Sequence, residues 1–243
     1  MLGLGTIVNC LSIIVGGILG LFVGKFINEK IQETLIKVCG LSTMFIAIAG
    51  VMSKMLGINE DGISSSHELL LIISLALGAI IGEIIDLDGK TEKFGIYLRN
   101  KTGNEQDNLF VSGFVSASLT VCIGAMAIIG AINDGISSDY SILFVKSILD
   151  FIIVMVMACS LGKGCIFSFI PVFILQFSVT LLSKFISPYL TQIALNNLSL
   201  VGSVLIFCVG YNLMKDDGKK IRVANLLPAI IIAIIIAYLP LNL

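Results

Sequence analysis

Residues 141–161 read SILFVKSILDFIIVMVMACSL, and this stretch decides the class of fold. Its charged side chains are Lys146 and Asp150, and almost all the rest is apolar. An α-helix needs about 20 mostly apolar residues to cross the hydrocarbon core of a bilayer, which is about 30 Å thick. The stretch therefore predicts a transmembrane helix that carries two charged groups near its middle.

Seven further apolar runs of similar character lie on either side of this one. Over the whole chain 57% of residues are hydrophobic and 13% are charged, whereas soluble domains have about a quarter charged. We expect an all-α polytopic transmembrane bundle of about eight spans, forming a single membrane domain over residues 1–243 within the lipid bilayer. The other runs are Gly5–Gly24, Val38–Ser53, Leu69–Leu87, Leu109–Ala131, Cys165–Phe185, Leu198–Met214 and Val223–Leu239.

The distribution of basic residues predicts the orientation of these helices. With eight spans, 12 of the 15 Lys and Arg residues fall in the loops after the first, third, fifth and seventh runs. Two, Lys54 and Lys184, fall on the other side. Basic loops stay in the cytoplasm, so both termini are expected outside. The net charge of −1 offers no basic surface for nucleic acid.

The two ends of the chain resemble each other at a spacing of about 160 residues. We expect three-helix repeats over 5–87 and 164–241, flanking two central helices over 109–161. Equivalent helices are five apart and so cross the membrane in opposite directions, an inverted repeat that recurs in secondary transporters. Chance similarity between two apolar sequences is the alternative. The matches pair Gly5-Thr6-Ile7 with Gly164-Cys165-Ile166, Lys25-Phe26-Ile27 with Lys184-Phe185-Ile186, Thr43 with Ser203, and Gly50 with Gly210.

Asp150 carries the strongest functional signal in the sequence. A carboxylate near the membrane centre costs about 2.5–3.5 kcal/mol on insertion scales and must face the bundle interior, water or a partner. Lys146 lies one helical turn earlier on the same face. The first interpretation is a cation or proton site at Asp150, with Lys146 setting its charge. The second is a structural ion pair that holds the helix to its neighbours.

Several polar side chains inside the other runs are candidates to line the same site. Buried amides and hydroxyls in membrane helices bind either a ligand or a neighbouring helix. Ser112, Ser116, Thr120 and Gly124 recur every four residues and form a small, polar stripe along one helix face. The candidate lining residues are Asn9, Ser116, Thr120, Gln176, Asn225 and, at the cytoplasmic end of the third run, Glu83.

Other motifs favour packing and argue against catalysis. Gly16, Gly20 and Gly24 form a GxxxGxxxG face, which lets helices approach closely within the bundle or between subunits of a homo-oligomer. The chain has no P-loop, GxSxG or HExxH motif. Its six cysteines form no CxxC pair and His67 is its one histidine. We therefore expect no enzyme, no catalytic residue, no metal site and no cofactor.

Four blocks of sequence, in order along the chain, resemble a known family. The chain resembles the bacterial membrane proteins catalogued as domain of unknown function 554, the YdfK-like proteins. The resemblance implies a polytopic protein of the bacterial inner (plasma) membrane, sometimes described as a transport protein, and implies no substrate. The blocks are Gly5-Thr6-Ile7-Val8-Asn9 with the glycines after it, Cys122 to Gly130, Lys146 to Asp150, and Val223-Ala-Asn225-Leu-Leu-Pro228.

Taken together, these patterns favour transport of a small solute or ion. H⁺ and Na⁺ are the candidate coupling ions, and Asp150 is the candidate coupling site. Two alternatives stay open at this point. The first is an ion channel formed by a homo-oligomer, and the second is a structural or regulatory membrane protein without transport.

Overall fold

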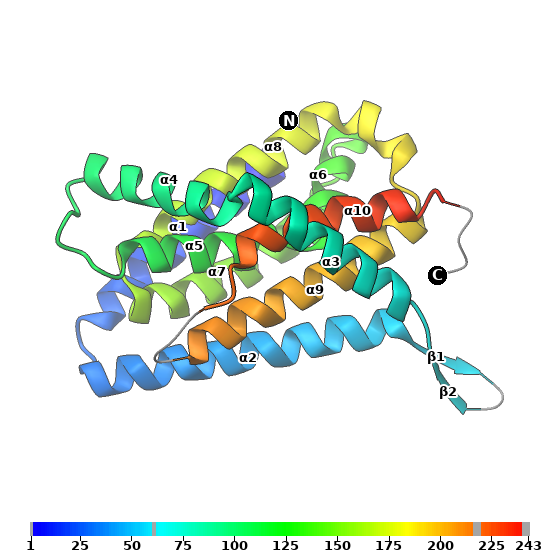
Figure 1. Ribbon diagram of the computed structural model, residues 1–243. Helices are drawn as coiled ribbons and strands as arrows, with labels where there is room; N and C mark the ends of the chain where they lie inside the picture. Colours follow the sequence, from blue (N-terminus) through cyan, green and yellow to red (C-terminus); the bar gives the residue numbers. More distant parts are fainter. Residues whose placement is uncertain (1, 60–61, 216–219, 240–243) are drawn as a thin grey trace.

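The computed structural model describes residues 2–59, 62–215 and 220–239, and these form a bundle of helices (Figure 1). The predicted all-helical membrane fold is confirmed. Within the described ranges the α-helices are α1 (Leu4–Gly24), α2 (Glu29–Met55), α3 (Glu68–Ile85), α4 (Leu87–Lys101), α5 (Phe110–Cys122), α6 (Ala125–Ser137), α7 (Ser141–Leu161), α8 (Phe169–Ile186), α9 (Gln192–Met214) and α10 (Pro228–Ile236). Short 3₁₀ turns, among them η1 (Lys163–Ser168) and η3 (Val223–Leu226), precede α8 and α10.

The number of membrane spans depends on how one broken helix is counted. In the part of the chain that is described, six helices are long and apolar enough to cross a membrane. Helices α5 and α6 form a seventh span if they are counted together, although their axes differ by 62°. The last apolar run gives a shorter helix over Val223–Ile236. The expected total of eight spans therefore stays a prediction.

Two connections differ from the sequence expectation of helices joined by loops. The link between α2 and α3 forms an antiparallel hairpin of β1 (Leu56–Asn59) and β2 (Gly62–Ser65), which projects from one end of the bundle (Figure 1). The second run also extends well before Val38, because Asn28 accepts a hydrogen bond from the amide of Ile31 and caps a polar first turn. At the opposite end of the bundle, the link between α3 and α5 contains a further helix, α4 (Figure 1).

The glycine face of α1 packs against the backbone of α7. A Cβ atom at Gly16 would lie 2.5 Å from the carbonyl oxygen of Phe151. A Cβ at Gly24 would lie 2.7 Å from that of Cys159, and Gly20 meets the backbone between them in the same way. The GxxxGxxxG face is therefore used within the chain, and it places α1 directly beside the helix that carries Lys146 and Asp150.

Helix α2 packs along α9, and the two lie side by side in Figure 1. Gly40 and Gly210 face each other, so that a Cβ on either would lie 2.7 Å from the carbonyl oxygen of the other. Gly50 packs against Ser203 further along the pair. These helices are the middle helices of the two expected repeats. A two-fold axis that relates the repeats to each other would bring their middle helices together. The repeat itself stays a prediction, and residues 60–61 of its first copy and 216–219 and 240–241 of its second lie outside the described residues.

Candidate functional site

The span made by α5 and α6 is broken in its middle. Helix α5 ends at Cys122 and α6 begins at Ala125. Gly124 between them has φ 147° and ψ 149°, a conformation that a glycine adopts without the clash of a Cβ. In a continuous helix the amide of Ala125 would bond to the carbonyl of Val121. The break leaves that carbonyl free for another donor.

Lys146 of α7 supplies this donor and also pairs with Asp150. Its Nζ lies 2.8 Å from the carbonyl oxygen of Val121. It lies 2.9 Å from Oδ1 and 2.8 Å from Oδ2 of Asp150. Lys146 is 8% exposed and Asp150 is 3% exposed. A complete ion pair with three short hydrogen bonds is thus buried at the broken helix.

Two amides from other helices complete this group. Asn9 of α1 donates its Nδ2 to Asp150 Oδ2 at 3.0 Å and to Gln176 Oε1 of α8 at 3.4 Å. Asn9 and Gln176 are at most 1% exposed. Within the described part of the chain, Asn9 Oδ1 and Gln176 Nε2 have no hydrogen-bond partner. The structure therefore brings four of the sequence candidates into one polar cluster, defined here as Asn9, Lys146, Asp150 and Gln176.

A cavity of about 610 Å³ borders the polar cluster. It lies among α2, the α5–α6 break, α7 and α9, and both Lys146 and Asp150 line it. Thr120 and Gly124 contribute from the broken span, while most of the wall is apolar. Apolar side chains that are half exposed, such as Leu149 and Ile152, also line this cavity. The arrangement gives a largely apolar chamber with one ammonium and one carboxylate in its wall.

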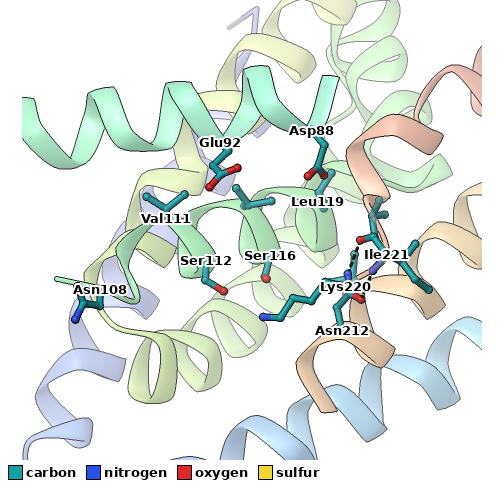
Figure 2. A pocket seen from close by; sticks show the side chains of 13 residues that line it. Asp88, Glu92, Asn108, Val111, Ser112, Ser116, Leu119, Asn212, Lys220 and Ile221 are labelled. Carbon is teal, nitrogen blue, oxygen red and sulfur yellow. Dashed lines mark hydrogen bonds between the residues drawn. The ribbon is translucent and has the colours of Figure 1, made fainter. Parts of the chain in front are cut away.

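A second, polar pocket of about 320 Å³ lies between α4, α5 and α9. Figure 2 shows Asp88 and Glu92 reaching it from α4, with Lys220 on the opposite side and Ser112 and Ser116 on α5. Of the four residues of the predicted stripe, Ser112 and Ser116 therefore line this pocket. Thr120 and, in the break after α5, Gly124 line the larger cavity. Ser116 and Thr120 are joined directly, since the Thr120 hydroxyl donates to the Ser116 carbonyl at 2.8 Å.

The two remaining candidates lie away from the polar cluster. Glu83 is half exposed near the end of α3, where Arg222 donates to it at 2.6 Å. Arg222 also pairs with Asp86 and lies 3.8 Å from Asp88. Asn225 is buried in η3, and its Oδ1 accepts from the amide of Asp88 at 2.7 Å. These residues join α3, α4 and η3 at one end of the bundle.

Partial burial changes the electrostatic environment of the Asp88 carboxyl. Partial burial raises the pKa of its carboxyl above the usual value, and the nearby carboxylates Asp86 and Glu83 act in the same direction. The Ala224 amide and Arg222 oppose this shift and do not cancel it. Asp88 is therefore a carboxylate held in an environment that favours its neutral form.

Sequence reasoning missed a buried carboxylate at the other end. Asp134 reads as part of a turn in Asn133-Asp134-Gly135, but it lies in α6 and is 0% exposed. Its Oδ1 accepts from the amide of Gly3 and its Oδ2 from the amide of Gly5, both at 3.0 Å. A carboxylate at a helix N-terminus satisfies free amides there. The α5–α6 break, which no sequence pattern marked, is what carries Asp134 to the start of α1.

Comparison with known proteins agrees with this fold. The chain is 28% identical over 237 residues to the Uncharacterized protein YqgA of Escherichia coli (strain K12), covering 95% of this chain and 94% of that protein. It is 29% identical over 234 residues to the Uncharacterized membrane protein YdfK of Bacillus subtilis (strain 168), covering 96% and 95%. No solved structure matches it. The model of a family described as Protein of unknown function (DUF554) matches residues 4–238, and the chain belongs to this family of membrane proteins.

Proposed function

We propose that this chain is a transporter, and not an enzyme, that moves a small solute or ion across the plasma membrane of a bacterium with both of its termini outside. Asp150 is the group that couples movement to H⁺ or Na⁺. The observation that carries this proposal is the buried Lys146–Asp150 pair at the α5–α6 break, on the wall of the 610 Å³ cavity.

The energetics of the pair support a functional role. A buried ion pair is weak as a source of stability, because desolvation offsets much of the attraction and apolar residues often serve as well. Charged groups inside membrane segments usually mark the path of a substrate or an ion. A discontinuous helix with free backbone groups at membrane depth is also a feature of substrate sites in secondary transporters. All of these features meet at Lys146 and Asp150.

The geometry favours H⁺ over Na⁺ as the coupling ion. Both carboxylate oxygens of Asp150 already accept from the Lys146 ammonium at 2.8–2.9 Å. A sodium ion would have to displace this positive charge from the same oxygens. A proton needs one oxygen and simply neutralises the carboxylate. The apolar wall of the cavity, with hydroxyls such as Thr120, suits a small solute with both apolar and polar parts.

A flux screen in proteoliposomes across ions and small metabolites tests the proposal. Wild type is compared with Asp150→Asn, Lys146→Met and the double variant Lys146→Met/Asp150→Asn. Asp139→Asn is the matched control, because Asp139 lies just before the same helix and is exposed. We expect Asp150→Asn to fold and insert but to lose coupled flux, while Asp139→Asn keeps it.

The stability of the same variants separates a functional pair from a structural one. Removing one partner of a buried pair typically costs about 3–5 kcal/mol. If Asp150 merely neutralised Lys146, Asp150→Asn would be destabilised and the double variant would recover both stability and wild-type flux. That result would overturn the proposal and favour a structural or regulatory membrane protein. A stable Asp150→Asn variant with wild-type coupled flux would also overturn it.

One observation favours a second candidate, a homo-oligomeric ion channel. Residues with apolar, half-exposed side chains line the cavity where it lies between α2 and α7, including Val38, Ile46, Leu149 and Ile152. A neighbouring subunit could cover this face and complete a pore. Planar-bilayer recording separates the two functions. Unitary currents that flow passively down their gradient would favour the channel, and solute accumulation driven by an ion gradient would favour the transporter.

A further inference from the structure

A row of unpartnered polar atoms leads away from the polar cluster between α1 and α8. It consists of Thr6 Oγ1, Asn9 Oδ1, Gln176 Nε2 and Thr180 Oγ1, none of which has a hydrogen-bond partner among the described residues. All four side chains are at most 1% exposed. Buried polar atoms in proteins are nearly always paired with protein or with ordered water. Four such atoms together therefore indicate buried water.

The members of the row on α1 and on α8 extend toward the same end of the bundle, because the two helices are antiparallel. Gly3 packs against Phe177, whereas the Cys10 thiol approaches the carbonyl of Phe169 at 3.6 Å. Residue numbers therefore rise along α1 as they fall along α8. Thr6 precedes Asn9 by three residues, about 4.5 Å along the helix axis. Thr180 follows Gln176 by four residues, so both threonines lie one turn nearer to the same end of the bundle.

Asp134 closes the row at that end. Its two carboxylate oxygens accept from the amides of Gly3 and Gly5, which directly precede Thr6 at the start of α1. The next residue, Gly135, packs against the carbonyl of Thr180 and the side chain of Ser183 on α8. One carboxylate thus stands at each end of the row, Asp134 beside the threonines and Asp150 beside the amides. We call Thr6, Asn9, Gln176 and Thr180 the polar column.

Some other buried hydroxyls in the bundle are bonded within their own helices. Ser147 and Ser203 each donate to the carbonyl four residues earlier in their own helix, both at 2.7 Å. Hydroxyls in membrane helices are commonly satisfied in this way. Thr6 and Thr180 lack this bond, and their oxygens are free to bind water. Three further unpartnered hydroxyls, those of Ser74, Ser118 and Ser160, lie on α3, α5 and α7.

We propose that protons reach Asp150 from the Asp134 end of the bundle through water molecules held by the polar column. This inference rests on the proposed coupling role of Asp150. The proton binds a carboxylate oxygen of Asp150 and converts it to the neutral acid, while Lys146 stays an ammonium and keeps its bond to the Val121 carbonyl. The ionisable groups facing the path are Asp134, Asp150 and Lys146, with the Cys10 thiol beside them on α1. In the predicted orientation this entrance faces outside.

Proton uptake into proteoliposomes with a trapped pH indicator tests the proposal. The variant Thr6→Val/Thr180→Val removes both hydroxyls at nearly constant volume. Thr6→Ser/Thr180→Ser keeps them, and Ser147→Ala/Ser203→Ala is the matched control that removes two hydroxyls already bonded within their helices. We expect the valine variant to lose at least tenfold in H⁺ uptake, while the serine variant and the control stay within twofold of wild type.

Thermal stability gives a readout that does not depend on transport. If water fills the column, the valine variant leaves that water short of partners, and its midpoint of unfolding will not rise. A clear rise in the midpoint of unfolding would mean that no water binds these hydroxyls, and it would overturn the proposed proton path. Normal H⁺ uptake in the valine variant, with uptake lost in Asp150→Asn, would overturn the column and leave the proposed function standing. Wild-type H⁺ uptake in Asp150→Asn would overturn the proposed function instead.

Discussion

Asn9 Nδ2 lies 3.0 Å from Asp150 Oδ2, and this bond joins α1 to α7 at the buried carboxylate. The two helices already approach closely through the glycines of α1. Asn9 therefore lies two turns before Gly16, where the close packing of α1 on the α7 backbone begins. Its amide offers the charged carboxylate a donor that belongs to a different helix from Lys146.

Replacing Asn9 should weaken the fold more than replacing a comparable buried amide. Asn9→Leu removes a hydrogen bond to a charged group, which is worth about 1.5–3 kcal/mol, whereas a bond between neutral groups is worth about 0.5–1.5 kcal/mol. Asn197, which donates to the carbonyl of Ala233 at 3.1 Å, supplies the neutral control. Unfolding of both leucine variants by SDS titration in micelles measures the difference. Equal losses of stability in the two variants would show that the charge on Asp150 does not strengthen its hydrogen bond with Asn9.

The glycine face of α1 should not tolerate even one methyl group. Gly16→Ala would place a Cβ 2.5 Å from the Phe151 carbonyl oxygen, and backbone cannot move aside cheaply. We expect a loss of about 1–3 kcal/mol, the usual result of overpacking. Ile18→Ala is the control, since Ile18 is 54% exposed on the same helix. The prediction fails if both variants unfold at the same SDS fraction.

Asp88 predicts a dependence of stability on pH with a definite sign. Its pKa is raised in the folded protein, so its contribution to stability is fully present below its ordinary pKa and is lost as pH rises through the raised value. The substitution Asp88→Asn removes that loss, and the new side-chain oxygen can still accept a hydrogen bond from the Ala224 amide. The variant should therefore match wild type in acid and exceed it in thermal midpoint near neutral pH.

Asp139 supplies a control of opposite sign for this experiment. The Ser141 hydroxyl and amide donate to its carboxylate and hold its pKa below the usual value. Asp139→Asn should match wild type in acid and fall below it near neutral pH. Parallel pH profiles for the two variants would contradict the assignment of burial as the dominant influence on Asp88.

The uneven distribution of basic residues predicts which loops face the cytoplasm. After removal of the native cysteines, a cysteine at Asn104 should be shielded from an impermeant thiol reagent in intact cells. A cysteine at Asp139 should be labelled. Labelling of both positions after the cells are opened checks that each site is reactive. The reverse pattern in intact cells would show that the helix count or the orientation is wrong.

The sequence was informative wherever one physical property dominated. The length of the apolar runs predicted the membrane helices, and the four-residue spacing of Lys146 and Asp150 predicted their contact. Asn9 and Gln176 stood out because an amide inside an apolar run needs a partner, and the structure joins them to the ion pair. In each case the signal was local to one helix.

The features that escaped prediction depend on more than one segment. Gly124 is one of three glycines within Leu109–Ala131 and does not by itself mark a break. The Val121 carbonyl that the break frees is satisfied by a lysine 25 residues away. Asp134 reads as a turn residue until the break carries α6 to the start of α1. Asn225 resembles Asn9 in its surroundings along the chain, yet it binds the amide of Asp88 at the end of the bundle.

The broken α5–α6 span bears on the two electrostatic states that the proposed protonation of Asp150 would give the ion pair. The C-terminal end of α5 carries a partial negative charge, and its Val121 carbonyl holds the Lys146 ammonium independently of Asp150. With Asp150 charged, the site is neutral. With Asp150 protonated, Lys146 keeps a partner, and the cavity wall carries one net positive charge that attracts anions. If a proton binds Asp150 as proposed, the bend in one helix thus lets that proton change the chamber from neutral to anion-attracting, without leaving the lysine unsatisfied.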